Sequence, residues 1–350
     1  MNVAIDVSPL KTGHFLQHRV RGTGFYIEHL RKSLIKGFKN DTFFFFTKGE
    51  PIPNEADVVH HPYFEPFFLT LPLIKKHKTV VTVHDLTPLV FAKEFPSGIK
   101  GMIKWQLQKK ILQNTDAVIT DSDCSKRDIE KFVGISPDKI HRIYLAADSH
   151  FKPLKNNQYE GIFEKFSLPK KFVLYVGDAT WNKNLPKLLE AIKIVKVPLV
   201  MVGKTLMEEK IDINNPWNKD LVEVQKIASE NKDIRRLGFV EANDLVALYN
   251  AATLLVMPSI YEGFGLPVLE AMQSGCPVVT TKGGSLSEIA GESALYVNAG
   301  DINDIATGIS RVFQDKELQV DLRKRGLQQA KKFSWEKTAK ETMEVYEALY

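Results

Sequence analysis

The chain has 350 residues, of which 44% are hydrophobic and 25% charged, and these values exclude a disordered, collagen-like or coiled-coil chain. At roughly 150 residues per domain the length predicts about two domains, and two cysteines, Cys124 and Cys276, are too few for a disulfide framework or a zinc cluster. The net charge of +5 is uneven, because residues 1–167 carry 24 Lys and Arg against 18 Asp and Glu, and residues 168–350 carry 23 against 24. The excess predicts an anionic partner for the first half, and without a zinc finger, RNP-type strand or Arg-rich arm we expect no nucleic acid.

Short apolar runs alternate with longer amphipathic segments along the whole chain. Runs without strict alternation are typical of strands covered on both faces, as in parallel sheets. The predicted strands are 2–7, 42–46, 56–60, 79–84, 116–121, 139–144, 172–177, 198–203, 234–239, 253–259, 277–281 and 294–297. Helical patterns between them include 26–34, 99–112, 185–194, 245–252 and 267–273. This alternation predicts an α/β protein with two doubly wound, Rossmann-like domains, and the Phe43–Phe46 run is interpreted as a buried strand.

A segment rich in Pro, Asn and Lys, residues 149–169, is interpreted as the connection between the domains. We therefore expect an N-terminal domain over residues 1–165 and a C-terminal domain over residues 166–333. Residues 334–350 have the pattern of a helix with Ser334 at its N-cap. Two such domains predict a ligand cleft between the carboxyl ends of their strands.

The strongest motif is YEGFGLPVLE, residues 261–270, which follows a predicted strand and opens a helix. Gly263 and Gly265 permit a sharp turn, and the N–H groups of the helix start suit a diphosphate. Glu270 could accept hydrogen bonds from ribose hydroxyls, and Glu262 would face the sugar. Taken singly, these residues could equally be a helix-dipole partner and a solvated loop residue. Their combination favours the donor site.

This Glu-x7-Glu element resembles that of the retaining glycosyltransferases of family 4, which have the GT-B fold. The resemblance covers most of the chain, through residues 21–30, 122–129, 175–185, 237–252 and 255–301. It implies two Rossmann-like domains facing each other across a cleft, and a C-terminal helix that crosses back to the N-terminal domain. It also implies metal-independent transfer of a hexose from a nucleotide diphosphate sugar to a glycan or lipid-linked acceptor, with no cofactor.

The resemblance assigns Lys183 to the leaving diphosphate, whose negative charge grows as the sugar bond breaks. The implied donor-binding residues are Glu270, Phe264, Gly265, Leu266, Gly263, Asn182, Val240 and Gly24. An arginine that the family places near the lysine is missing, because Asp178 and Asn182 occupy its two usual positions. Asn182 would offer a neutral hydrogen bond instead. A surface helix lysine is the alternative interpretation of Lys183.

In the first half, Arg21-Gly22-Thr23-Gly24 follows a long loop and precedes a helix expected to begin near Phe25. By resemblance, Gly24 lies near the donor and Gly22 near the acceptor, although a simple helix-entry turn would look the same. His84 ends a predicted strand and by resemblance contacts the donor sugar, with Asp85 toward the acceptor. A structural hydrogen-bonding role is the alternative for His84.

Asp121-Ser122-Asp123 looks like an Asp-x-Asp metal motif, but it lies at a strand-to-helix turn where Ser122 or Asp123 would cap the helix. We therefore expect no metal there. The chain has no G-x-S-x-G elbow, spaced NAD-type glycines or P-loop lysine, which argues against hydrolase, dehydrogenase and P-loop functions.

Residues 99–113, IKGMIKWQLQKKILQ, carry four lysines and no acidic residue. Such a helix could lie on an anionic bilayer, although a domain helix that buries its apolar stripe is the favoured interpretation. The first apolar run contains Asp6 and follows no basic region, and no stretch approaches the roughly 18–20 apolar residues of a membrane span. We expect a cytoplasmic protein, or one peripheral at the inner face of the membrane.

The donor sugar stays open at this point, with GDP-mannose as a weak preference from the mannosyltransferase-like character of PLVMVGK followed by GFV. A UDP-sugar is the alternative within the same class. A catalytically silent protein that binds a nucleotide sugar or glycan is the alternative from another class.

Overall fold

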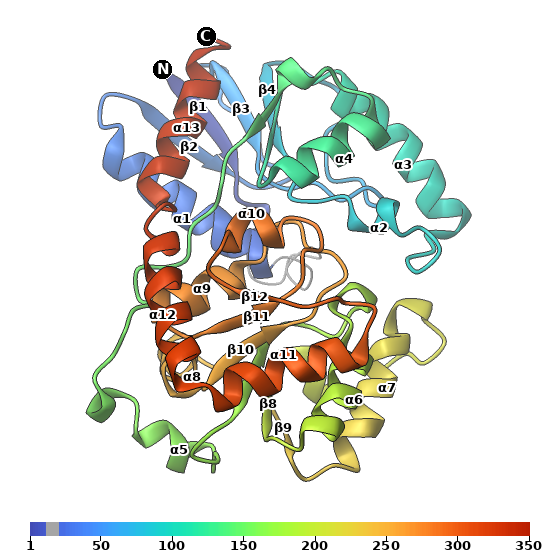
Figure 1. Ribbon diagram of the computed structural model, residues 1–350. Coiled ribbons are helices and arrows are strands. Elements are labelled where there is room, and N and C mark those ends of the chain that lie inside the picture. Colours follow the sequence, from blue (N-terminus) through green and yellow to red (C-terminus); the bar gives the residue numbers. More distant parts are fainter. Residues whose placement is uncertain (12–20) are drawn as a thin grey trace. The chain divides into compact units, whose positions relative to one another are not determined.

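The computed structural model describes residues 1–11 and 21–350, and it divides into two compact units. Unit 1 comprises Met1–Ala146 and Phe333–Tyr350, and unit 2 comprises Ala147–Lys332. Within the described residues, each unit contains a six-stranded sheet whose strands all pair in parallel, with helices packed around it (Figure 1). The predicted fold class, two doubly wound α/β units, is therefore confirmed.

The sheet of unit 1 has the strand order β2-β1-β3-β4-β5-β6. Its strands are β1 (Asn2–Asp6), β2 (Thr42–Phe46), β3 (Val58–His61), β4 (Lys78–Thr82), β5 (Ala117–Thr120) and β6 (Ile140–Arg142). Its helices are α1 (Arg21–Gly37), α2 (Thr87–Val90), α3 (Gly98–Gln113), α4 (Asp123–Val133) and α13 (Trp335–Glu347). Every residue of β3 and β5 is buried, as expected for strands covered on both faces.

The sheet of unit 2 has the order β12-β11-β10-β7-β8-β9. Its strands are β7 (Val173–Val176), β8 (Leu199–Val202), β9 (Ile234–Gly238), β10 (Leu254–Met257), β11 (Val278–Thr280) and β12 (Leu295–Tyr296). Its helices are α5 (Gly161–Lys165), α6 (Leu185–Val195), α7 (Lys219–Ser229), α8 (Ala242–Ala251), α9 (Leu266–Ser274), α10 (Leu286–Ala290), α11 (Ile302–Gln314) and α12 (Lys316–Ala330). The apolar residues of α6 that face the sheet, such as Leu185, Leu188 and Leu189, are fully buried and contribute about 1.5–3 kcal/mol each.

Helix α13 packs within unit 1, beside α1 (Figure 1). Ser334 caps it by accepting a hydrogen bond from the Lys337 backbone N–H at 3.1 Å, as predicted. The Tyr346 hydroxyl lies 2.6 Å from Nδ1 of the fully buried His60 on β3. A polar contact therefore joins the last helix to the centre of the first sheet.

Two sequence-based predictions differ from the structure. Residues 22 and 24 lie inside α1, so the helix start predicted near Phe25 is wrong; a glycine lowers helix stability by only about 1 kcal/mol and does not forbid a first turn. The loop expected before Arg21 falls on residues outside the described ranges. Strand β2 is an edge strand in which Phe43–Phe45 are half-buried and only Phe46 is buried, so the Phe43–Phe46 run is less enclosed than expected.

Candidate functional site

The segment between β10 and α9 forms a tight loop that a second loop supports. Gly265 precedes α9 with φ 99°, in the left-handed region that favours glycine. The Ser285 backbone N–H donates to the carbonyl oxygen of Glu262 at 3.0 Å, and the Ser285 hydroxyl donates to that of Phe264 at 2.7 Å. A Cβ on Gly284 would lie 2.2 Å from the Glu262 carbonyl oxygen. Glycine at 284 therefore permits the contact that fixes the shape of the loop over residues 258–265, called the motif loop below.

The Glu262 side chain is buried and paired with a lysine from the short 3-10 helix Trp181–Lys183 that follows β7. Lys183 Nζ lies 2.8 Å and 2.7 Å from the two carboxylate oxygens of Glu262, and the Ser259 hydroxyl donates to one of them at 2.6 Å. The side chains of Glu262 and Lys183 are 9% and 21% exposed. This geometry contradicts the alternatives of a solvated Glu262 and a free surface Lys183, because a buried carboxylate requires such compensation.

Asn182 and Asn184 hold the lysine segment against the motif loop. Asn182 donates from Nδ2 to the Tyr261 carbonyl oxygen at 2.9 Å, and its own carbonyl accepts from the Ile260 N–H at 2.7 Å. Asn184 adopts φ 59° at the start of α6 and donates to the Pro258 carbonyl at 3.0 Å. Residues 74 to 79 positions apart in the sequence are thereby held together by hydrogen bonds to backbone atoms, which a motif search along the chain does not reveal.

Glu270 lies one turn into α9 and is bonded to a buried tyrosine. The Tyr249 hydroxyl donates to Glu270 Oε2 at 2.8 Å. Burial raises the pKa of Glu270 to about 7, with the Tyr249 hydrogen bond opposing this rise and the charge of Asp148 adding to it. Glu270 is therefore a carboxyl group whose charge changes near neutral pH.

The two positions where the family arginine was expected have other contacts. The Asp178 carboxylate accepts from the Thr205 hydroxyl at 3.1 Å, and its carbonyl accepts from the Tyr175 hydroxyl at 2.7 Å. Asn182 donates a hydrogen bond to the Tyr261 carbonyl oxygen of the motif loop. Val240, one of the implied donor-binding residues, is buried two residues beyond the end of β9.

In unit 1, His84 lies two residues beyond β4 and is bonded to Asp121, the residue after β5. His84 Nδ1 and Asp121 Oδ2 are 2.7 Å apart. Ser122 caps α4 by accepting from the Ser125 N–H at 3.0 Å, which confirms the predicted cap. Asp123 lies 3.6 Å from Arg142, so the two aspartates of the Asp-x-Asp sequence have separate partners.

The other residues predicted in the first half lie in α1 and in the turn before α2. Gly22 is exposed in α1, and a Cβ on Gly24 would lie 3.7 Å from Leu10. Asp85 accepts from the Thr87 backbone N–H at 2.8 Å, an Asx turn that starts α2.

Helix α3 buries Trp105 and exposes apolar side chains on its opposite surface. Ile99 is 82% exposed and Ile103 is 65% exposed. The favoured prediction, a helix that buries its apolar stripe, is therefore only partly correct. Across the described helices, none combines the length and apolar character that a membrane span needs.

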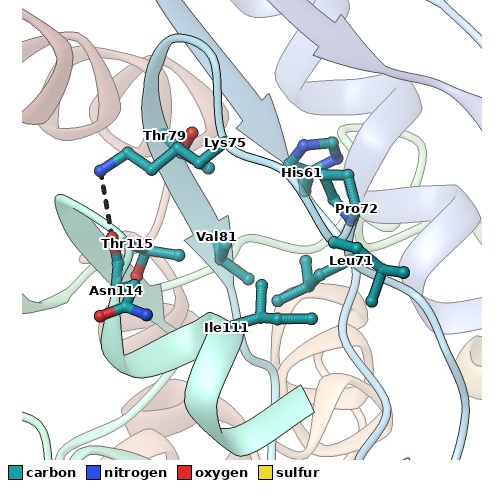
Figure 2. A pocket seen from close by; sticks show the side chains of 10 residues that line it. His61, Leu71, Pro72, Lys75, Thr79, Val81, Ile111, Asn114 and Thr115 are labelled. Atoms are coloured by element: carbon teal, nitrogen blue, oxygen red, sulfur yellow. Dashed lines mark hydrogen bonds between the residues drawn. The ribbon is translucent and has the colours of Figure 1, made fainter. Parts of the chain in front are cut away.

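The segment before β4 packs along α3 and encloses a pocket that the sequence did not indicate. Gln108 accepts from the backbone N–H groups of Thr70 and Leu71 at 2.8 Å and 2.9 Å. Between this segment, α3 and the sheet lies a cavity of about 230 Å³ (Figure 2). Its lining residues are His61, Leu71, Pro72, Leu73, Lys75, Thr79, Val81, Ile111, Asn114 and Thr115. None of the predicted site residues lines it.

Comparisons with known proteins agree with this architecture. The model described as Glycosyltransferase Family 4 matches residues 22–151, and the model described as Glycosyl transferases group 1 matches residues 160–329. The O-antigen chain mannosyltransferase B of Escherichia coli is 29% identical over 343 residues, which cover 91% of this chain and 86% of the relative.

Solved structures share the fold across the whole chain. Sucrose-phosphate synthase of Thermosynechococcus elongatus, 21% identical, has a TM-score of 0.76 over 100% of this chain and 99% of that one. Anabaena Alr3699/HepE, solved in complex with UDP and glucose, is 16% identical with a TM-score of 0.72 over 99% and 100% of the two chains. With two parallel α/β units and a family model on each, the chain belongs to the family 4 glycosyltransferases and has the GT-B fold.

Proposed function

We propose that this glycosyltransferase moves a hexose from a nucleotide diphosphate sugar to a glycan or lipid-linked acceptor, with retention of the anomeric configuration, in the synthesis of a surface polysaccharide or glycoconjugate. The observation that carries this proposal is the buried pair of Glu262 and Lys183 at the end of β10, with Glu270 on the helix that follows. Buried ionisable groups near the carboxyl ends of parallel strands often belong to functional sites.

In this proposal the donor nucleotide lies on unit 2. The backbone N–H groups of residues 263–266 meet the diphosphate at the start of α9, where the helix dipole favours an anion. Lys183 adds a positive charge, Glu270 accepts from the ribose hydroxyls, and Val240 borders the base. The pairing of Lys183 with Glu262 supports this assignment, because one side chain fixes the other in a single position.

In the transfer step, the acceptor hydroxyl attacks the anomeric carbon on the face from which the diphosphate leaves. The bond from that carbon to the phosphate oxygen breaks as the bond to the acceptor oxygen forms, and the departing phosphate oxygen takes the hydroxyl proton. Glu262 and His84 hold the sugar, and Gly22, Gly24 and Asp85 lie toward the substrates. No protein base is required, and no metal ion takes part.

The missing arginine favours one alternative, a silent protein that binds a nucleotide sugar or glycan. The presence of Glu262, Lys183 and Glu270 opposes that alternative. For an active enzyme, Asn182 and the backbone donors of the motif loop would replace the arginine as neutral hydrogen-bond donors.

The donor is tested with a panel of GDP-, UDP- and ADP-sugars, measuring release of the nucleoside diphosphate and the thermal shift caused by each. The relative in E. coli is named a mannosyltransferase, which supports mannose as the sugar; GDP-mannose is tested first and a UDP-sugar second. NMR of the product's anomeric proton tests retention. Binding without release from any donor would favour the silent alternative, and an inverted product would contradict the mechanism.

We further propose that α3 contacts the anionic inner face of a membrane where a lipid-linked acceptor lies. Between residues 95 and 115 the chain has four lysines and no acidic residue, and exposed Ile99 and Ile103 lie among them. The neighbouring segment adds Leu73 and Ile74, which are 67% and 72% exposed. Exposed apolar side chains among lysines suit an anionic bilayer, where each lysine contributes about 1 kcal/mol.

Co-sedimentation with vesicles of phosphatidylcholine and phosphatidylglycerol tests this contact. We expect binding at low salt that falls as salt rises, and much weaker binding by the double variant Ile99→Gln/Ile103→Gln. The matched control is Ile213→Gln/Val320→Gln, which replaces equally exposed apolar residues of unit 2. Absence of binding at low salt, or equal loss in both variants, would contradict the proposed contact.

A further inference from the structure

The sheet register of unit 1 brings His84 and Asp121 together. In the parallel pair of β4 and β5, Thr82 is opposite Ile119. His84 and Asp121 each follow these partners by two residues, so the chains leaving the two strands carry them side by side at the carboxyl edge. The Val83 N–H, which donates to the Ile119 carbonyl oxygen at 2.9 Å, continues the pairing beyond β4.

The imidazole of His84 is held from several sides. Its Nδ1 lies 2.7 Å from Asp121 Oδ2, and its backbone carbonyl accepts from the Ser125 hydroxyl at 3.0 Å. The Tyr26 ring meets the imidazole edge-on with centroids 4.9 Å apart. The Asp121 side chain is 4% exposed and that of His84 is 18% exposed. Because the Asp121 carboxylate is hydrogen-bonded to Nδ1, Nε2 is the nitrogen of His84 that can contact a ligand.

Two atoms of this pair lack protein partners. Within the described residues, His84 Nε2 and Asp121 Oδ1 make no hydrogen bond, although both are shielded from solvent. A buried polar atom without a hydrogen-bond partner has a cost in folding stability. A fold that retains this cost at a strand end suggests that a ligand supplies the missing partner.

The charged and titratable groups around His84 are Asp121 from β5, the adjacent Asp85, His60 from β3 and the Tyr26 hydroxyl from α1. Burial disfavours the imidazolium, but the charge and hydrogen bond of Asp121 outweigh burial and raise the pKa of His84. The charge of Asp85 acts in the same direction, as does the nearby Pro62 carbonyl, which does not reach hydrogen-bond geometry with the imidazole within the described residues. His60 is fully buried, and its pKa is lowered to about 3, chiefly by burial, so it stays neutral.

We propose that Asp121 is a positioning residue for sugar transfer: it holds the Nδ1 proton of His84 and thereby presents Nε2 to a hydroxyl of the donor sugar. This inference rests on the proposed function, in which His84 contacts that sugar. It also gives the Asp121-Ser122-Asp123 sequence a role without a metal, since Asp121 orients the histidine, Ser122 caps α4 and Asp123 lies at the start of that helix.

The test compares Asp121→Asn and Asp121→Glu with Asp123→Asn, a control in the same turn whose side chain is 51% exposed. The first measurement is the NMR titration of the His84 imidazole in the whole protein, with the signal assigned from His84→Gln. In Asp121→Asn we expect the pKa of His84 to fall by about one unit or more, because an opposite charge at this distance shifts a pKa by about 1–3 units. Asp123→Asn should leave it within a few tenths of a unit.

The second measurement is transfer with the donor identified by the nucleotide-sugar panel. Asp121→Asn should lower kcat about tenfold or more with little change in the donor KM, and it should move the acid limb of the pH profile to lower pH. Asp121→Glu should restore part of the rate. An unchanged titration, or a kcat equal to that of Asp123→Asn, would overturn the inference. The titration needs no active enzyme. It therefore distinguishes a failure of the inferred role of Asp121 toward His84 from a failure of the proposed transfer.

Discussion

Replacing Lys183 with methionine removes the ammonium group from the buried pair while keeping a side chain of similar length. The carboxylate of Glu262, 9% exposed, would then keep only the Ser259 hydroxyl as a partner. Breaking a buried ion pair on one side costs about 3–5 kcal/mol. Because Lys183 is 21% exposed and Ser259 remains, we expect about 2–4 kcal/mol. For a unit of this size that corresponds to a fall in Tm of roughly 5–15 °C.

An exposed ion pair within α6 serves as a control that separates the effect of burial from that of contact distance. Lys193 and Glu190 also lie 2.7 Å apart, but their side chains are 44% and 45% exposed. Lys193→Met should therefore cost about 0–1 kcal/mol. The assay is thermal and urea unfolding of both variants, with Lys183→Met/Glu262→Gln to complete the cycle. The double variant should recover most of the lost stability, because the unpaired charge is gone. Equal losses at 183 and 193, or no recovery in the double variant, would refute the reasoning.

Three further substitutions address the same unit. Glu262→Gln should lower transfer about 100-fold or more while the affinity for nucleoside diphosphate changes little; equal loss of both by calorimetry would contradict its role at the sugar. Glu270→Gln should raise the donor KM more than it lowers kcat. The raised pKa of Glu270, about 7 against the usual ~4.3, means that its contribution to stability is complete below about pH 4.3 and is lost as the pH rises to about 7. Wild-type protein should therefore lose stability relative to Glu270→Gln across that interval, and parallel melting curves would refute this. Gly284→Ala should disturb the motif loop and lower both Tm and activity, because its Cβ would lie 2.2 Å from the Glu262 carbonyl oxygen, whereas Gly161→Ala meets nothing within 4 Å and should be neutral.

The strands could be predicted because the signal is local. A continuous apolar run between helical patterns indicates a strand in a parallel sheet wherever it occurs, and each of the predicted runs overlaps one of the observed strands. The N-caps Ser122 and Ser334 were predictable for the same reason. The start of α1 was not, because two glycines in a first turn look like a loop in sequence although their cost is small.

The candidate site was only half predictable. The sequence indicates which residues carry chemistry, but the partner of each depends on sheet order and register. Lys183 was expected to meet a diphosphate, and the structure shows the Glu262 carboxylate on its ammonium. Asp121 was considered only as a false metal ligand, although equal spacing beyond two neighbouring strands could have suggested its contact with His84. The supporting loop at Gly284 left no signal beyond its glycines.

The contact between Tyr346 and His60 has a consequence for folding during synthesis. Residues 1–146 leave the ribosome long before Tyr346, and all of unit 2 is made in between. Until then β3 keeps a buried imidazole whose Nδ1 has yet to receive its phenol partner. The first sheet therefore lacks its contact with α13 during synthesis, while the whole of the second unit can already fold. Unit 1 is therefore completed only after all of unit 2 has been made, and removal of α13 should destabilise unit 1 most.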